Sequence, residues 1–424
     1  MCDNINKKRE NGDESMKILN FGSGNIDFVY SLEHIVSPGE TEVSEDMNIF
    51  PGGKGLNQSI ALARAGAKVY HAGCFGTDGA MLLKLLGENG VNTNYSRREN
   101  CKNGHAIIQV GSDGENSIFI YPGSNAMITN SYVDSVLKNF GKDDFIILQN
   151  EINNLNYIIE CAFKRGMKIV LNPSPCDEKL KNIDYKMLTY LILNEIEAKI
   201  MSDCDNFENA AAYFLKKNPQ LNVLITLGKN GCIFYNGTVK IFQPSFSVET
   251  VDTTAAGDTF TGYFIAMVSN KKDYKSALRI SSAASALAVS KKGAAPSIPY
   301  IDDVLNSIDT LCENINGKSR ILKEKISVFI KQNIKNVTIK DIARELGYSQ
   351  SYTQAVVKNI YGEPVSKLIQ TFRCEAAAEA LKNTDLPISE VINSVGYENE
   401  SFFRRVFKEK YGKNLLEFRH DFQN

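Results

Sequence analysis

The sequence predicts an α/β protein that is followed by a separate, all-helical domain. Short apolar runs alternate with helical stretches from Lys17 to about Ile298. Continuous apolar runs are typical of parallel strands covered by helices on both faces, so we expect a doubly wound sheet. After Arg320 the strand-like runs stop and only helical periodicity remains.

The sheet domain is expected to contain six buried strands with helices between them. The helices fall at 55–65, 81–89 and 155–165, and a final one at 300–311. Two stretches differ, because 29–50 and 104–121 read as a small accessory sheet that could cover a site at one edge. The expected strands are 17–21, 68–74, 145–148, 168–171, 190–194 and 223–226.

Composition sets the expected domain limits: a disordered leader at 1–15, the sheet domain at 16–311, a polar linker at 312–320 and the helical domain at 321–424. The net charge is −1, but residues 320–424 carry 17 Lys and Arg against 13 Asp and Glu. A mildly basic end on an acidic body is a weak indication of a nucleic-acid partner.

The nine cysteines include no C-x-x-C pair, and no apolar run approaches the roughly 20 residues that a membrane span needs. There is also no secretory segment. We therefore expect a cytoplasmic protein with free thiols and no membrane partner.

The helical domain contains an internal repeat. IKDIARELGY at 339–348 matches ISEVINSVGY at 388–397, and SYTQAVVKNIYG at 351–362 matches SFFRRVFKEKYG at 401–412. Each copy reads as a helix that stops at a glycine, a short turn and a second helix, which is the helix-turn-helix pattern.

The most specific motif of the sheet domain is VDTTAAGDTF at 251–260. Small residues before a helical run predict a compact turn whose N–H groups, aided by the helix dipole, form an anion hole. Asp258 would lie at the start of that helix. It could be a helix-capping carboxylate or a general base that takes a proton from a hydroxyl, and these ten residues leave both interpretations open.

Three further stretches are suggestive together; alone, the first is moderate evidence and the other two are weak. PGGKGLNQ at 51–58 lets the backbone approach a ligand, although an ordinary glycine-rich turn has the same pattern. GSGNID at 22–27 follows the first strand and places Asn25 and Asp27 two residues apart, where a plain polar loop is the alternative. NEIE at 194–197 could orient water around Mg²⁺, but its spacing is frequent by chance.

In this order and after strands, these motifs resemble the PfkB carbohydrate-kinase family, and its ribokinase branch in particular, over about residues 17–309. The resemblance implies that Asp258 is the catalytic base and that the N–H groups of Ala255, Ala256 and Gly257 form the anion hole. It implies a sugar site at Asn25, Asp27, Gly52, Gly53, Lys54, Asn57, Glu151 and Asp258.

The same resemblance implies the nucleotide and cation sites. ATP would lie along Asn194, Thr226, Gly228, Gly231 and Gly257, with Glu197 near Mg²⁺ through water. An activating monovalent cation such as K⁺ would be held by Asp252, Thr254, Lys291, Gly293 and Ser297. The implied reaction is attack of the ribose O5 hydroxyl on the γ-phosphate of ATP, and the family resemblance also implies a homodimer formed through the accessory sheet.

The helical domain resembles the AraC/XylS family of DNA-binding domains, with a linking helix at 365–382 between two helix-turn-helix units. In the second unit Phe402, Val406, Phe407 and Tyr411 are expected in the core. The implied partner is double-stranded DNA, and the candidate contact residues are Ser349, Gln350, Ser351, Thr353, Gln354, Lys358, Ser401, Arg404, Arg405 and Lys408.

Three functions are compatible with this sequence. The first is an active ribose kinase tethered to a transcription regulator. The second is a regulator whose kinase fold only senses a sugar or nucleotide. The third is a kinase for a nucleoside or another sugar. The presence of Asp258, the anion-hole run, Asn194 and Glu197 favours the first over the second, because a sensor would not need a base.

Overall fold

The computed structural model describes residues 16–313, 315–346 and 348–423. The leader at 1–15, which we expected to be disordered, lies outside the described residues, as does Gly347. Contacts divide the chain into two compact units, Met1–Asn314 and Ile315–Asn424, which are described separately below.

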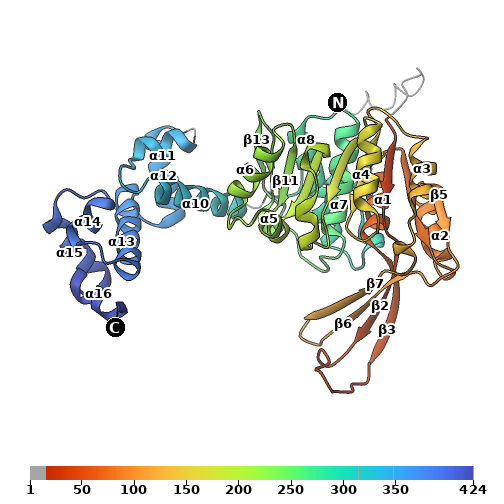
Figure 1. Ribbon diagram of the computed structural model, residues 1–424, viewed down its shortest axis with the longest axis horizontal. Coiled ribbons are helices and arrows are strands. Elements are labelled where there is room, and N and C mark those ends of the chain that lie inside the picture. The colour runs from red at the N-terminus through yellow and green to blue at the C-terminus, as the bar shows by residue number, and fades with distance from the viewer. Residues whose placement is uncertain (1–15, 314, 347, 424) are drawn as a thin grey trace. The chain divides into compact units, whose positions relative to one another are not determined.

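The first unit is built on a nine-stranded sheet (Figure 1). The pairs from β11 to β5 are parallel, whereas β12 and β13 are added antiparallel at one edge. The predicted doubly wound sheet is confirmed, but β5, β12 and β13 were not among the predicted strands. In spatial order the strands are β13 (Lys240–Gln243), β12 (Cys232–Tyr235), β11 (Asn222–Thr226), β10 (Tyr190–Asn194), β9 (Lys168–Asn172), β8 (Phe145–Gln149), β1 (Ile18–Phe21), β4 (Val69–Phe75) and β5 (Asn92–Arg98).

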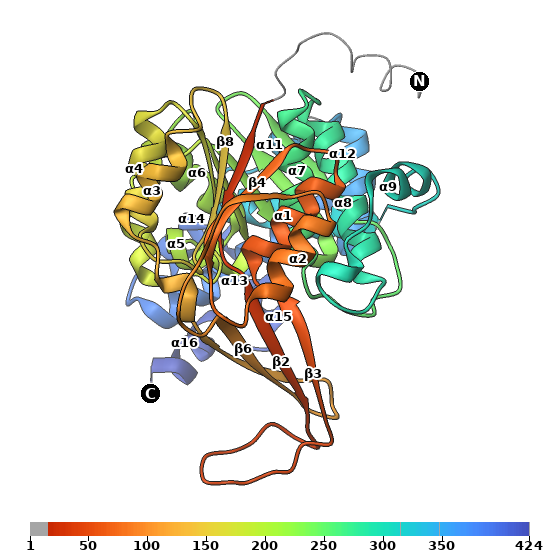
Figure 2. The same ribbon diagram turned by 90° about the vertical axis from the view of Figure 1, so that its right-hand side faces the viewer.

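Helices cover both faces of this sheet, as Figure 2 shows. A continuous core of buried aliphatic and aromatic side chains joins the sheet to one helical layer, and α1 packs directly on α7 within it. That layer holds α1 (Lys54–Arg64), α2 (Ala80–Glu88), α7 (Ala256–Ser269), α8 (Tyr274–Val289) and α9 (Ile301–Ser307). The opposite layer holds α3 (Asn130–Leu137), α4 (Leu155–Lys164), α5 (Glu195–Ser202) and α6 (Phe207–Lys217).

The predicted accessory sheet is present as a four-stranded lid that projects away from the main sheet (Figures 1 and 2). Its order is β3-β2-β6-β7, and β2 starts only four residues after β1 ends. At the base of the lid, Asn25 lies in register with Gly52 on one side and Gly104 on the other. The strands are β2 (Asn25–Ser31), β3 (Asp46–Gly52), β6 (Gly104–Val110) and β7 (Asn116–Tyr121).

The last residues of the first unit are attached to the segment that follows β13. Phe246 and Glu313 form an antiparallel bridge, and Ser247 N donates to Cys312 O at 2.8 Å. The Glu313 carboxylate also lies 3.7 Å from Arg279 Nε. The chain is therefore fixed immediately before it enters the second unit.

The second unit is all-helical, as predicted, and helix α10 begins at Ile315, inside the segment that we expected to be a linker. Two separate apolar clusters share the long helix α13, which lies where the linking helix was predicted. The helices are α10 (Ile315–Gln332), α11 (Ile339–Leu346), α12 (Gln350–Tyr361), α13 (Val365–Asn383), α14 (Ile388–Ser394), α15 (Glu400–Tyr411) and α16 (Leu415–Gln423).

One core prediction for this unit was wrong. Phe402 is 41% exposed on α15, and the residue that fills the core is its neighbour Phe403, together with Val406 and Phe407. Helical spacing alone did not distinguish the two adjacent phenylalanines, because either one continues an apolar stripe with Val406. Tyr411 packs at the edge of the core, as expected.

Candidate active site and nucleic-acid interface

The first turn of α7 carries Asp258, whose side chain is 6% exposed. Asn57 Nδ2 donates to Asp258 Oδ2 at 3.2 Å, and Gln58 Nε2 donates to Asp258 Oδ1 at 2.9 Å. The residue that precedes the helix is Ala255, in the left-handed region at φ 60°, and it makes no side-chain cap. The carboxylate is thus held by α1 across the helix interface and does not cap its own helix.

The predicted sugar residues Asn25 and Asp27 lie on the same face of β2, at the base of the lid. A Cβ atom on Gly52 would lie 1.9 Å from Asp27 Oδ2, and one on Gly53 would lie 2.7 Å from Asn25 N. Gly53 also has φ 93°. The paired glycines are therefore required, because Gly52 lies against the Asp27 side chain and Gly53 lies against the backbone of Asn25.

Glu151 joins this group from the loop after β8. Ser23 Oγ donates to its Oε2, and Lys54 N donates to the same oxygen at 2.8 Å. Burial raises the pKa of Glu151. Burial also raises the pKa of Asp27 to about 7, with a smaller contribution from the charge of Glu151.

Lys54 supplies the opposite charge. Burial alone would lower its pKa, but the nearby carboxylates of Asp258, Glu151 and Glu197 outweigh burial, so the pKa is raised. A cation among buried carboxylates stays protonated and favours their ionised forms. This group therefore combines the carboxylates of Asp27 and Glu151 with one fixed positive charge.

A cavity of about 490 Å³ lies on the other side of the first turn of α7, where Ala256 and Gly257 line it. Of the predicted ATP residues, Thr226, Gly228, Gly231 and Gly257 line this cavity. A Cβ on Gly257 would meet nothing within 4 Å, so the backbone there faces open space. Of the three predicted anion-hole residues, Ala256 and Gly257 thus line this cavity, and Asp258 follows them in the first turn of α7.

Asn194 and Glu197 form a capping box at the start of α5. Asn194 Oδ1 accepts from Glu197 N at 2.8 Å, and Glu197 Oε2 accepts from Asn194 N at 2.9 Å. Asn194 is in register with Thr226 at the carboxyl ends of β10 and β11. The pair therefore stands at the strand ends beside the nucleotide cavity, although Asn194 is not part of the cavity lining.

Two of the predicted monovalent-cation residues, Thr254 and Gly293, are hydrogen-bonded to Asp252. Its Oδ1 accepts from Thr254 N at 2.9 Å and from Thr254 Oγ1 at 2.6 Å, and its Oδ2 accepts from Gly293 N at 2.9 Å. Although burial opposes ionisation, these hydrogen bonds lower the pKa of Asp252. Lys291 and Ser297 lie on the same loop, where Ser297 Oγ donates to Ala294 O.

Asn125 is a site residue that the sequence analysis missed. Its Oδ1 accepts from Gly24 N at 3.2 Å, and its Nδ2 donates to Asn25 Oδ1 at 2.7 Å. The backbone N–H fixes which end of Asn125 is oxygen, so Asn25 must present its own oxygen to Asn125. The Nδ2 group of Asn25 takes no part in this bond. No sequence pattern marks Asn125, which lies in a short turn before α3.

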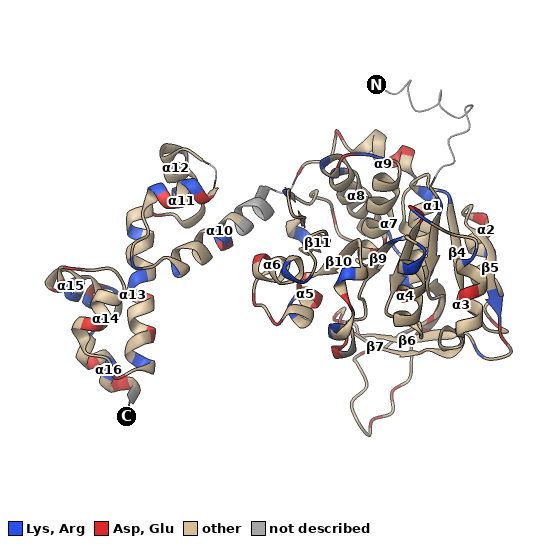
Figure 3. Ribbon diagram, turned by 45° about the horizontal axis from the view of Figure 1, so that its top comes forward, with Lys and Arg blue, Asp and Glu red and all other residues tan. Residues whose placement is uncertain are grey.

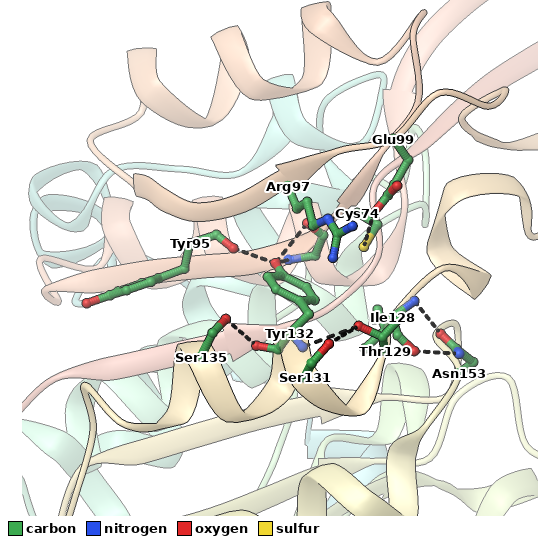
Figure 4. A network of polar contacts seen from close by, with 11 residues as sticks. Cys74, Tyr95, Arg97, Glu99, Ile128, Thr129, Ser131, Tyr132, Ser135 and Asn153 are labelled. Carbon is green, nitrogen blue, oxygen red and sulfur yellow. Dashed lines mark hydrogen bonds and ion pairs between the residues drawn. The ribbon is translucent and has the colours of Figure 1, made fainter.

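The turn that carries Asn125 is anchored at two points, shown in Figure 4. Asn153 clamps Ile128, with Oδ1 accepting from Ile128 N at 3.0 Å and Nδ2 donating to Ile128 O at 2.9 Å. Tyr132 reaches from α3 to the edge of the sheet, where its hydroxyl accepts from Gly73 N and donates to Tyr95 O. The amide that orients Asn25 is therefore built into a rigid segment.

In the second unit, α12 and α15 occupy the recognition-helix positions of the two helix-turn-helix units. Thr353 does not fit the role that we predicted, because it is fully buried and its Oγ1 donates to Ser349 O at 2.9 Å. It stabilises the first turn of α12 and cannot contact a base. The exposed predicted residues are Ser349, Gln350, Ser351, Gln354, Lys358, Ser401, Arg404, Arg405 and Lys408.

Two of the basic residues of α15, Arg404 and Arg405, are held in ion pairs on their own helix. Arg404 lies 3.1 Å from Glu400, and Arg405 lies 4.0 Å from Glu409 and stacks its guanidinium 5.3 Å from the Phe402 ring. Figure 3 shows Lys and Arg interspersed with Asp and Glu along this unit. Exposed ion pairs of this kind contribute little stability and can exchange for phosphate contacts.

A helix-covered sheet, a projecting β lid with polar side chains at its base, and a buried carboxylate in the same helix turn as the lining of a cavity of about 490 Å³ are the features expected of a carbohydrate kinase. A model of the pfkB family carbohydrate kinases matches residues 15–301, and a helix-turn-helix domain model matches residues 342–421. The chain belongs to the pfkB family of carbohydrate kinases and carries an AraC-type helix-turn-helix domain at its C-terminal end.

Individual relatives agree with this assignment. The ribokinase of Haemophilus influenzae is 35% identical over 303 residues, a match that covers 68% of this chain and 97% of that protein. The crystal structure of a Thermotoga maritima ribokinase has a TM-score of 0.63 at 33% identity, covering 69% of this chain and 99% of that one. An Arabidopsis thaliana ribokinase complexed with ribose and ATP has a TM-score of 0.61 at 29% identity, with the same coverage.

Among the described residues, no helix has the length and apolar character that a membrane crossing requires.

Proposed function

We propose that this protein transfers the γ-phosphoryl group of ATP to the O5 hydroxyl of ribose, with Asp258 as general base. The observation that carries the proposal is the position of the Asp258 carboxylate. It lies at the start of α7, bonded to Asn57 of the sugar side, while the adjacent Ala256 and Gly257 line the nucleotide cavity. An alcohol bound beside Asp258 therefore faces the helix N-terminus where the transferred group would lie.

The sugar side supports a polyhydroxylated substrate. Asp27 and Glu151 provide carboxylate acceptors, and the oriented Nδ2 group of Asn25 provides a donor. Asn25 is buried and the carboxylates of Asp27 and Glu151 are half-buried at the lid base, where hydrogen bonds to hydroxyls are stronger than on an open surface. Ribose is the substrate that the relatives' names indicate.

Two cations fit this scheme. Glu197 has a buried carboxylate with one oxygen bound to Asn194 N, and its other oxygen suits a water of Mg²⁺, which would supply charge neutralisation on the phosphates. The ionised Asp252, with Thr254 and the 291–297 loop, suits a monovalent cation beside the anion hole. Both kinds of ion prefer oxygen ligands, and both groups of residues provide oxygen atoms.

The base assignment is tested by Asp258→Asn in the full-length protein. We expect kcat to fall by roughly 10²–10⁴-fold, because the amide cannot accept the hydroxyl proton, while ribose binding is largely retained. Steady-state ADP release and ribose titration by calorimetry measure the two quantities. Near-normal turnover of this variant would refute the role of Asp258.

Substrate choice is tested with a panel of pentoses, hexoses and nucleosides. Ribose should give the highest kcat/KM for ADP formation, and mass spectrometry should place the phosphate on O5. A preference for a nucleoside would identify a nucleoside kinase. Saturable ribose binding without ADP formation from any substrate would identify a non-catalytic sensor.

The second unit binds DNA in this proposal through α12 and α15, which enter successive faces of the major groove. A regulator of this kind would adjust transcription to the supply of sugar or nucleotide. The test is DNA affinity with and without ribose and a non-hydrolysable ATP analogue, on a site selected from random duplexes. Weak, salt-abolished and sequence-indifferent binding would contradict specific recognition.

A homodimer formed through the lid is also part of the proposal. The two outer strands of the lid, β3 and β7, carry apolar side chains that are exposed to water in a single chain. They are Met47, Ile49, Ile118, Phe119, Ile120 and Tyr121. Light scattering should give twice the chain mass, and Phe119→Asp should return the mass to that of one chain.

A further inference from the structure

We infer that Gln58 is a positioning residue for the phosphoryl transfer and that a buried chain of side-chain amides sets its orientation. This inference rests on the proposed function and deepens it. Gln58 Nε2 donates to Asp258 Oδ1 at 2.9 Å, the shorter of the two side-chain bonds that reach the carboxylate. Gln58 is fully buried and has no direct path to substrate except through Asp258.

The amide chain runs beneath the site through α1, β8 and β1 and ends at His71 of β4. Gln149 Nε2, from β8, donates to Gln58 Oε1 at 2.7 Å and to Asn20 Oδ1 at 2.9 Å. Asn20 Nδ2, from β1, donates to Ser59 Oγ at 2.9 Å, and Ser59 Oγ lies 2.8 Å from His71 Nδ1. Asn20, Gln58, Ser59, His71 and Gln149 all have no exposed surface.

The backbone fixes the direction of this chain from two sides. Asn172 Nδ2 donates to Ile192 O at 2.9 Å, so Asn172 must present its oxygen to Gln58 Nε2, which lies 3.0 Å away. At the other end, Asn20 Nδ2 donates to Gly55 O at 2.7 Å, so Asn20 must present its oxygen to Gln149. A carbonyl oxygen only accepts, and neither amide can be turned over without losing its bond.

It follows that Gln58 presents its NH₂ group to Asp258 whether or not Asp258 is ionised. An amide donor that is fixed before the reaction favours the ionised form of the Asp258 carboxylate and fixes the orientation of its two oxygens. A free glutamine could instead swing its oxygen towards the carboxylate, which would repel it. The chain therefore supplies electrostatic preorganisation to the base without any contact to sugar or ATP.

Gln58→Glu tests this directly, because it keeps an oxygen acceptor for Gln149 and replaces the donor by a carboxylate oxygen, which also brings a negative charge against Asp258. Gln58→Met removes both groups at similar volume and serves if the acidic variant does not fold. Asn218→Asp is the matched control, since Asn218 is a buried amide that donates to Tyr185 O and Leu188 O, away from this site. All are made in the full-length protein.

We expect kcat to fall by about 10- to 100-fold in both Gln58 variants, with little change in the KM for ribose. The acidic limb of the kcat/KM profile should move to higher pH in Gln58→Met, because the ionised base has lost a donor. Asn218→Asp should lower the melting temperature but leave kcat and the pH profile unchanged.

The outcomes separate this inference from the proposed function. Wild-type kcat and an unshifted pH profile in folded Gln58 variants, with Asp258→Asn inactive, would overturn the role of Gln58 alone. A KM increase without a kcat change would do the same, since it would place Gln58 in sugar binding. Unimpaired turnover by Asp258→Asn would overturn the assigned base, and the inference with it.

Discussion

The carboxyl group of Asp27 makes the stability of the sugar-free protein depend on pH. Burial, and to a smaller extent Glu151, raises the pKa of its carboxyl to about 7 from an ordinary value of 3.8. The folded protein then binds this proton more tightly than the unfolded chain does. The stabilisation is fully present below about pH 4 and is lost as the pH rises towards 7.

Asp27→Asn should remove this pH dependence. Wild type should lose stability relative to the variant as the pH rises from about 4 to 7, by at most a few kcal/mol at roughly 1.4 kcal/mol per pKa unit. Urea unfolding of the sugar-free protein at several pH values measures the difference. Asp205→Asn, at a carboxyl with 91% exposure, is the control. Parallel profiles for wild type and Asp27→Asn would contradict the prediction.

Individual site residues could be predicted from the sequence only where they belong to a recognisable motif. Asp258, Asn25 and Asp27 were found because they stand in motifs after strands. Asn125 was missed, because its role depends on a turn that approaches Gly24 from 101 residues away. Thr353 was misassigned, since a helix position does not reveal whether a short polar side chain turns inward.

Among the elements, the crossing of α1 and α7 determines the geometry of the site. A Cβ on Gly262 of α7 would lie 2.5 Å from Ala61 Cβ and 3.1 Å from Gln58 O. The two helices can approach this closely only because residue 262 has no side chain. The same approach brings Asn57 and Gln58 within hydrogen-bond distance of Asp258.

Gly262→Ala should push the two helices apart. We expect a loss of about 1–3 kcal/mol of stability from overpacking, together with a lower kcat because the bonds to Asp258 lengthen. Thermal unfolding and ADP release check both effects. Gly87→Ala in α2 is the control, because a Cβ there meets nothing within 4 Å. A Gly262→Ala protein that keeps wild-type melting temperature and kcat would contradict the argument.

The strands show why element prediction was only partly successful. The buried parallel strands were identified from their continuous apolar runs, such as FIIL in β8. The edge strand β5 (NTNYSRR) was not, because one side of it is solvated and its sequence is largely polar. The hairpin β12–β13 was also not predicted. Its second strand, β13, is only four residues long and gives a weak pattern.

At the scale of the whole molecule, the two units have separate apolar cores, and the second unit is itself divided between two clusters. Arg373 of α13 holds the two halves of the second unit together. Its Nε donates to Ile334 O at 3.0 Å and its Nη2 to Lys335 O at 2.9 Å. Its guanidinium also lies 5.3 Å from the Tyr397 ring in the other half.

Arg373→Ala should make the distance and orientation between α12 and α15 less well fixed. Charge-assisted hydrogen bonds are worth roughly 1.5–3 kcal/mol, so specific DNA affinity should fall by about tenfold or more, while non-specific binding changes little. Fluorescence anisotropy on selected and scrambled duplexes measures both. Lys367→Ala removes an equal charge from the same helix and is the control. An equal loss on both duplexes would indicate that only charge had mattered.

The bridge between Phe246 and Glu313 has a consequence for communication along the chain. Phe246 and Ser247 form part of the wall of the 490 Å³ cavity. They are also hydrogen-bonded to Cys312 and Glu313, just before α10 begins. The peptide that leads into the helix-turn-helix unit is therefore hydrogen-bonded to residues of the cavity wall, so a molecule bound in this cavity would lie against residues that hold that peptide.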